Sequence, residues 1–100
     1  MKNKMRPVHP GEILVEEYIK PLGISVRAVS IALHVPYSRL NEIVRGRRGV
    51  SADTALRFSR LFGGDAAEWL ARQSEYDLQV AEALAGKRIA KEVDPRALTT

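Results

Sequence analysis

Apolar side chains recur at helical spacing along most of the chain, and no stretch alternates apolar and polar residues as a half-buried strand does. Capping residues, prolines and glycines divide this pattern into five predicted helices, at about 10–20, 25–34, 36–45, 51–62 and 65–86. The sequence therefore predicts an all-α fold of five helices. Residues 1–8 are expected to form an N-terminal arm, 9–86 the folded domain, and 87–100 a tail that is mobile or ordered only against a partner.

The helix boundaries follow from the residue types that begin and end helices. The first helix is predicted to begin at Pro10 with His9 as its cap, and to end at Pro21 and Gly23. Its apolar stripe is predicted to comprise Ile13, Leu14, Tyr18 and Leu22. The other four helices begin with residues suited to helix N-termini, which are Ser25, Pro36, Ser51 and Asp65.

The second and third predicted helices have the spacing of a helix-turn-helix, with about three residues between them and apolar residues at 29, 33, 35, 40 and 43. In this motif the recognition helix buries one stripe, here Leu40 and Ile43, and presents its opposite face to the DNA groove. The candidate base-reading residues are Tyr37, Ser38 and Asn41 on that face and Arg39 at its edge. The candidate phosphate contacts are Arg27, Arg45, Arg47 and Arg48.

The charge of the chain supports this interpretation by its distribution more than by its sum of +4. Residues 25–60 contain seven arginines and no lysine against two acids, whereas residues 61–86 contain one arginine against five acids. Arginine favours bidentate contacts with phosphate or base edges. An arginine-rich surface that is merely solvated remains the alternative.

Composition excludes several other classes of function. The 100 residues include no cysteine, which excludes disulfides and thiolate zinc sites. No catalytic grouping or phosphate loop occurs, and His9 and His34 lie on different elements, so we predict no enzyme, cofactor or metal. No apolar run approaches the roughly 20 residues of a membrane span. The basic N-terminus leads into no hydrophobic region, so we expect a cytoplasmic protein without a signal peptide.

The last predicted helix is longer than a core of this size requires. Its candidate dimer-interface residues are Trp69, Tyr76, Val80 and Leu84. A small domain that recognises a half-site needs a two-fold mate, which favours a dimer. The alternative is a helix that simply lies over the core.

At this point the sequence resembles the HigA-type antitoxins, a group within the Xre/Cro-like helix-turn-helix proteins. The resemblance covers about residues 8–86. It depends on the order and spacing of several short pieces, which are His9-Pro10-Gly11-Glu12-Ile13-Leu14, Pro21-Leu22-Gly23-Ile24-Ser25, Arg39-Leu40-Asn41-Glu42-Ile43-Val44-Arg45-Gly46-Arg47-Arg48-Gly49, Ala52-Asp53-Thr54-Ala55-Leu56-Arg57, Phe62-Gly63, Glu68-Trp69-Leu70 and Gln73-Ser74-Glu75-Tyr76-Asp77-Leu78.

The resemblance implies a lambda-repressor-like DNA-binding domain that acts as a homodimer on a palindromic operator of its own operon. It also implies neutralisation of a HigB/RelE-like mRNA endonuclease toxin. Three positions depart from the usual motif: His34 replaces the glycine of the turn, Ser30 replaces an alanine, and Val26 replaces a glutamine that can contact phosphate. His34 is expected to adopt a left-handed backbone, which histidine tolerates better than most residues.

Two other functions remain open from the sequence. One is a stand-alone Xre-family transcriptional regulator without a toxin, which the neighbouring gene would distinguish. The other is an interaction module that no longer binds DNA, suggested by Val26 and His34. The polar recognition face and the arginine-rich turn argue against an interaction module that no longer binds DNA.

Overall fold

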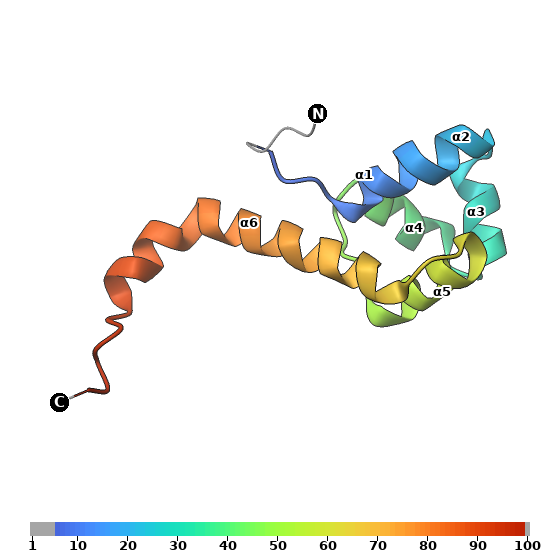
Figure 1. The fold of residues 1–100 in the computed structure, drawn as a ribbon. Helices are drawn as coiled ribbons and strands as arrows, with labels where there is room; N and C mark the ends of the chain where they lie inside the picture. Colours follow the sequence, from blue (N-terminus) through green and yellow to red (C-terminus); the bar gives the residue numbers. More distant parts are fainter. Residues whose placement is uncertain (1–5, 100) are drawn as a thin grey trace.

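A computed structural model describes residues 6–99, which fold entirely as helices, turns and connecting segments (Figure 1). The five expected helical rods are present, and the first of them is subdivided. In chain order the elements are α1 (Pro10–Leu14), η1 (Val15–Ile19), α2 (Lys20–Leu22), α3 (Val26–Leu33), α4 (Tyr37–Val44), α5 (Ala52–Phe62) and α6 (Ala66–Glu92). The all-α, five-helix prediction is confirmed for this part of the chain.

The first rod runs through Pro21 instead of ending there. His9 caps it as predicted, because its side chain accepts a hydrogen bond from the backbone N–H of Gly11. The middle segment widens into a π-helix, in which the N–H of Lys20 donates to the carbonyl of Val15. Proline lacks an N–H and its ring clashes with the carbonyl four residues earlier, so a wider turn accommodates it. The rod ends at Gly23, whose φ of 64° is left-handed.

One member of the predicted first stripe is not in the core. Leu22 is 59% exposed, because it follows the widened turn and lies outside the apolar face. Ile19, which the pattern did not single out, is buried in the core.

The helix-turn-helix forms at the predicted residues. The Ser25 hydroxyl accepts from the N–H of Ala28 at 3.0 Å and caps α3. His34 ends α3 with φ 58° and ψ 43°, which confirms the expected left-handed turn. Pro36 is the N-cap residue of α4, one position before the first helical turn in which we expected it.

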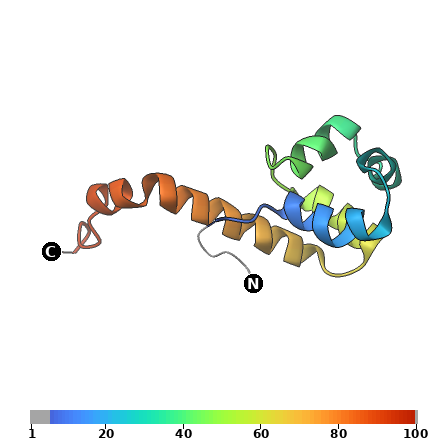
Figure 2. The same cartoon turned by 90° about the horizontal axis from the view of Figure 1, so that it is seen from above.

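Helix α6 is longer than predicted and changes the shape of the molecule. It begins at its Asp65 cap as predicted, but it continues through Gly86 to Glu92, so the predicted end at Gly86 is wrong and residues 87–92 of the expected tail are helical. An interior glycine costs about 1 kcal/mol relative to alanine, and the alanines and long basic residues around it favour the helix. The distal half projects from the body in both views (Figures 1 and 2). The radius of gyration is accordingly 16.9 Å, against about 13 Å for a compact chain of this length.

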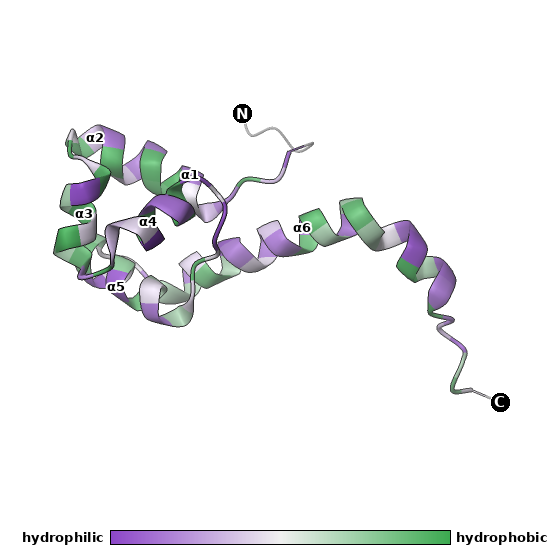
Figure 3. Ribbon diagram, turned by 180° about the vertical axis from the view of Figure 1, so that it is seen from behind, coloured by the Kyte–Doolittle hydropathy of each residue, from purple (hydrophilic) through white to green (hydrophobic). Residues whose placement is uncertain are grey.

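The core lies between the first rod and helices α3 to α6. The predicted helix-turn-helix residues Val29, Leu33, Val35, Leu40 and Ile43 are all buried. Phe58 of α5 and Trp69 of α6 meet edge to face, with ring centroids 4.8 Å apart. The apolar residues on the distal part of α6 lie outside this core, as the green segments of Figure 3 show. Within the described residues, no helix is long and apolar enough to cross a membrane.

Candidate DNA-binding surface

The position of α4 is set by a close approach to the first rod. At Gly11 a Cβ atom would overlap the backbone carbonyl of Ile43, so only glycine allows α1 to approach α4 at this distance. Leu40 and Ile43 are both 0% exposed, and they fix the rotation of α4 about its axis. The opposite face of α4 is consequently held toward solvent by backbone packing as well as by side chains.

Three of the four candidate base-reading residues lie together on the outward side of α4, and Arg39 lies at the edge of that side. Tyr37 is 38% exposed. Ser38 and Arg39 are also exposed, and Asn41, one turn later, is partly exposed. Side chains at i, i+1 and i+4 share one side of a helix, which is the arrangement that a major groove admits. The structure thus brings Tyr37, Ser38 and Asn41 together. Arg39 lies toward α5, where its charge helps to lower the pKa of the Asp53 carboxyl. The reading of bases by these residues stays a prediction.

Arg27 and Tyr37 form a contact that the sequence did not indicate. The guanidinium carbon of Arg27, in the first turn of α3, lies 4.4 Å from the centroid of the Tyr37 ring at the start of α4. A cation over an aromatic face at this distance is attracted by the ring quadrupole. The contact places a candidate phosphate-binding residue beside a candidate base-reading residue and restricts the freedom of both.

The other candidate phosphate contacts surround the glycine turn after α4. Gly46 has φ 76°, and the N–H of Arg47 returns to the carbonyl of Glu42 at 2.8 Å. The side chains of Arg45 and Arg47 are exposed. The Arg48 Nε donates to the Glu42 carboxylate at 2.8 Å, which holds that arginine along the turn.

His9 connects this turn to the first rod. Its Nδ1 accepts from the N–H of Gly11 at 2.9 Å, and its ring meets Tyr76 edge to face at 4.8 Å. Burial lowers the pKa of the His9 imidazole, while a hydrogen bond with the Arg48 backbone acts in the opposite direction. The neutral ring therefore joins the start of α1, the arginine turn and α6.

Gln73 is a second connection that the sequence analysis missed. Its side-chain oxygen accepts from the N–H of Val50 at 2.8 Å, and its amide nitrogen donates to Asp77 at 3.0 Å. Gln73 is buried on the core-facing side of α6, between Trp69 and Tyr76. A polar residue on that stripe was the available signal, and its function is to fix the loop after α4 onto α6.

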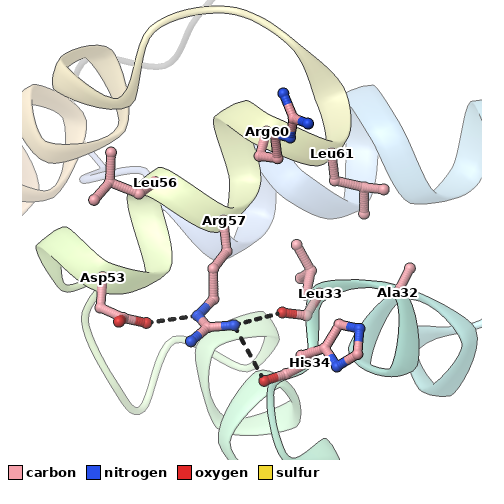
Figure 4. Close-up of a pocket in the computed structure, with 8 residues that line it drawn as sticks. All are labelled: Ala32, Leu33, His34, Asp53, Leu56, Arg57, Arg60 and Leu61. Carbon is pink, nitrogen blue, oxygen red and sulfur yellow. Dashed lines mark hydrogen bonds and ion pairs between the residues drawn. The ribbon is translucent and has the colours of Figure 1, made fainter.

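Arg57 is one of the seven arginines in residues 25–60, but its side chain makes contacts within the fold. Its Nε donates to Asp53 at 2.6 Å, and its terminal nitrogen donates to the carbonyl of Leu33 at 3.0 Å. Figure 4 shows this side chain reaching from α5 across a surface pocket of about 530 Å³ to the end of α3. The hydrogen bond and charge of Arg57 lower the pKa of the Asp53 carboxyl. The left-handed turn at His34 is thereby supported from α5.

The four candidate dimer residues do not share one free surface. Trp69 is 5% exposed and packs against Phe58 and Tyr18, so it belongs to the core of its own chain. Tyr76 contacts His9, and Val80 is partly buried. Leu84 alone of the four is fully outward, at 81% exposed.

The comparisons with known proteins agree with this geometry. The helix-turn-helix family matches residues 15–69. Virulence-associated protein I of Dichelobacter nodosus is 62% identical over 81 residues, which cover 81% of this chain and 75% of that protein. The Pseudomonas aeruginosa antitoxin HigA, solved with the higBA promoter, has a TM-score of 0.87 and 47% identity, over 90% of this chain and 98% of that one. The antitoxin GraA in complex with its operator has a TM-score of 0.84 and 46% identity, over 94% and 95%.

The chain belongs to the helix-turn-helix family. Within that family its relatives include HigA-type antitoxins and virulence-associated protein I, as the resemblance implied. The family consists of DNA-binding antitoxins and regulators and is not an enzyme family.

Proposed function

We propose that this protein is an antitoxin that represses its own operon. As a homodimer it binds a palindromic operator through α4, and it neutralises a HigB/RelE-like mRNA endonuclease toxin. The single observation that supports the DNA-binding part is the outward face of α4, where Tyr37, Ser38 and Asn41, with Arg39 at the edge, lie beside exposed arginines. The operator complexes solved for HigA and GraA support the same assignment.

The side-chain chemistry of this surface separates base-reading residues from phosphate-binding residues. Asn41 and Arg39 carry amide and guanidinium groups that form paired hydrogen bonds with base edges. The arginines at 27, 45, 47 and 48 neutralise phosphates and set the register on the duplex. Val26 replaces a residue that can contact phosphate, and the guanidinium of Arg27 beside it supplies a cation at the same end of α3.

A mobility-shift titration with the DNA upstream of the gene tests operator binding. The wild-type protein is expected to shift that fragment at lower concentration than a scrambled fragment of the same length. Asn41→Ala is expected to reduce this preference by about 1–3 kcal/mol while leaving the salt dependence unchanged. Arg60→Ala, at an arginine of α5 that lines the pocket of Figure 4 and is none of the candidate DNA contacts, is the control that should leave binding unaltered. Absence of any shift at low salt would contradict the proposal.

Toxin neutralisation needs its own experiment. Co-expression with the product of the neighbouring gene should restore growth that this product alone arrests, and the two proteins should co-purify. The second candidate function is a stand-alone Xre-family regulator, which the named HTH-type transcriptional regulators among the relatives favour. Operator binding without a toxic neighbour would support that function instead.

A further inference from the structure

The pocket between α3 and α5 has no part in the proposed function. Its volume is about 530 Å³, within the range of about 300–1,000 Å³ that is usual for small-molecule sites. The end of α3 contributes Ala32, Leu33 and His34 to its lining (Figure 4). The lining residues from α5 are Asp53, Leu56, Arg57, Arg60 and Leu61. The pocket therefore lies beside the turn that joins α3 to the recognition helix, and it contains none of the candidate DNA contacts.

Part of this pocket is apolar and exposed to solvent. On the α5 side Leu56 is 63% exposed and Leu61 is 42% exposed. On the α3 side Ala32 is exposed, and Ile31, next to the pocket, is 69% exposed. A ligand with a hydrocarbon body removes such surfaces from water, which is favourable. This part of the pocket is suited to the apolar portion of a ligand.

The charged side chains of the pocket favour an anion. Two arginines, Arg57 and Arg60, line it together with one acid, Asp53, whose carboxylate is already paired with the Arg57 Nε at 2.6 Å. Within the part of the chain that the structure describes, the Arg60 guanidinium has no hydrogen-bond or ion-pair partner. A guanidinium matches a carboxylate with two parallel N–H groups. A ligand that carries one carboxylate on an apolar body is thus complementary to both parts of the pocket.

Arg57 connects the pocket to the recognition helix. Its Nη1 donates to the carbonyl of Leu33 at 3.0 Å and lies 3.4 Å from the carbonyl of His34. These carbonyls belong to the end of α3 and to the left-handed residue that leads into α4. A carboxylate is a stronger acceptor for a guanidinium than a neutral carbonyl. A carboxylate bound in the pocket therefore competes with the turn for the same N–H groups.

We propose that this pocket binds a small carboxylate with an apolar body, and that the bound carboxylate draws Arg57 away from the turn and weakens operator binding. Arg57 and Arg60 bind the carboxylate, while Leu56, Leu61 and Ala32 contact the hydrocarbon. The turn then loses its hydrogen bonds to α5, so α4 is held less rigidly. The effect on the operator rests on the proposed function, whereas the binding of the carboxylate does not.

A nuclear magnetic resonance titration of the full chain with octanoate tests the site directly. Octanoate is expected to shift the amide signals of residues 32–34 and 56–61 with a dissociation constant of about 1 mM, which is usual for a ligand of this size. Acetate, which lacks the chain, and octanol, which lacks the charge, should each bind at least tenfold more weakly. Equal binding of octanol would overturn the proposal, as would the absence of saturation at ten times the expected constant.

Two variants locate the bound octanoate. Arg60→Ala and Leu56→Asp both change exposed side chains, so the fold should be retained, and each should raise the octanoate dissociation constant at least fivefold. Arg96→Ala, at an exposed arginine beyond the end of α6, is the matched control and should leave this constant unchanged. Unchanged binding in either pocket variant would place octanoate elsewhere and overturn the proposal.

Fluorescence anisotropy with labelled operator tests the second half of the proposal. Saturating octanoate should lower the operator affinity of the wild-type protein about fivefold, relative to the same concentration of acetate, which matches the added salt. Arg57→Ala removes the same hydrogen bonds and should lower the affinity by a similar factor, with no further response to octanoate. Arg60→Ala should bind the operator normally and respond little to octanoate at the concentration that saturates the wild-type protein.

The two titrations separate this inference from the proposed function. Octanoate binding that leaves operator affinity unchanged, or normal operator binding without any octanoate binding, would overturn the inference and leave the proposed function standing. Saturable octanoate binding by a protein that shifts no operator would contradict the proposed function, and with it the effect on the operator, but not the site.

Discussion

The arginine turn after α4 predicts how operator affinity depends on salt. Arg47 and Arg48 are exposed at this turn, and in a homodimer the pair occurs twice, so Arg47→Ala/Arg48→Ala removes four cations from the complex. Each phosphate contact contributes about 0.9 to the slope of log affinity against log salt. The slope of the double variant should therefore be smaller by about 3.6. Between 50 and 200 mM salt the wild-type protein should lose about 150-fold more affinity than the variant.

The assay is fluorescence anisotropy with labelled operator and with a random duplex, each titrated at four salt concentrations. Both duplexes should show the same decrease in slope, because phosphate contacts carry no sequence information. Arg60→Ala, on α5, provides the matched control and should keep the wild-type slope. The reasoning is refuted if the double variant changes the preference between the two duplexes while its slope equals that of the wild-type protein.

Three further predictions concern the contacts that position the surface. Gly11→Ala should destabilise the fold by about 1–3 kcal/mol in urea unfolding, because the added Cβ overlaps the α4 backbone. Gly86→Ala is the control: it lies in an open helix interior and should stabilise the fold by about 1 kcal/mol. Burial lowers the pKa of the His9 imidazole in the folded protein, so the unfolded chain binds a proton first as the pH falls. The free energy of unfolding should therefore fall as the pH drops below 6.5 and level off below the folded pKa. His9→Gln should abolish this pH dependence in parallel melts. Gln73→Leu leaves the N–H of Val50 without its acceptor and should lower the free energy of unfolding by about 1–3 kcal/mol in the same urea assay. A decrease no larger than that of an exposed substitution would contradict the role of Gln73 in holding the loop.

The elements that the sequence predicted correctly are those decided by neighbouring residues. Ser25, Ser51 and Asp65 each cap a helix through an N–H two or three positions later. The left-handed turn at His34 and the burial of Leu40 and Ile43 follow from spacings within the helix-turn-helix. Such interactions close within about one helical turn, so the residue types reveal them directly. For the same reason the outward position of the candidate base-reading residues was predictable.

Other features depend on partners that are distant in the sequence. Gln73 lies 23 residues from the amide that it accepts from, and Arg57 lies 24 residues from Leu33. Nothing in either residue's neighbourhood indicates that an ordinary polar or basic side chain is used inside the fold. Likewise, glycine is required at position 11 only because α1 approaches the backbone of α4 closely there.

What the sequence by itself determined is the set of helices, the helix-turn-helix and the basic face, because caps, hydrophobic period and charge are local properties. Only the tertiary structure decided the widened turn before Pro21, the burial of Trp69 in its own core and the continuation of α6 past Gly86. In each case packing or chain geometry elsewhere in the protein outweighs a small local preference. A glycine that costs about 1 kcal/mol cannot end a helix whose flanking residues favour its continuation.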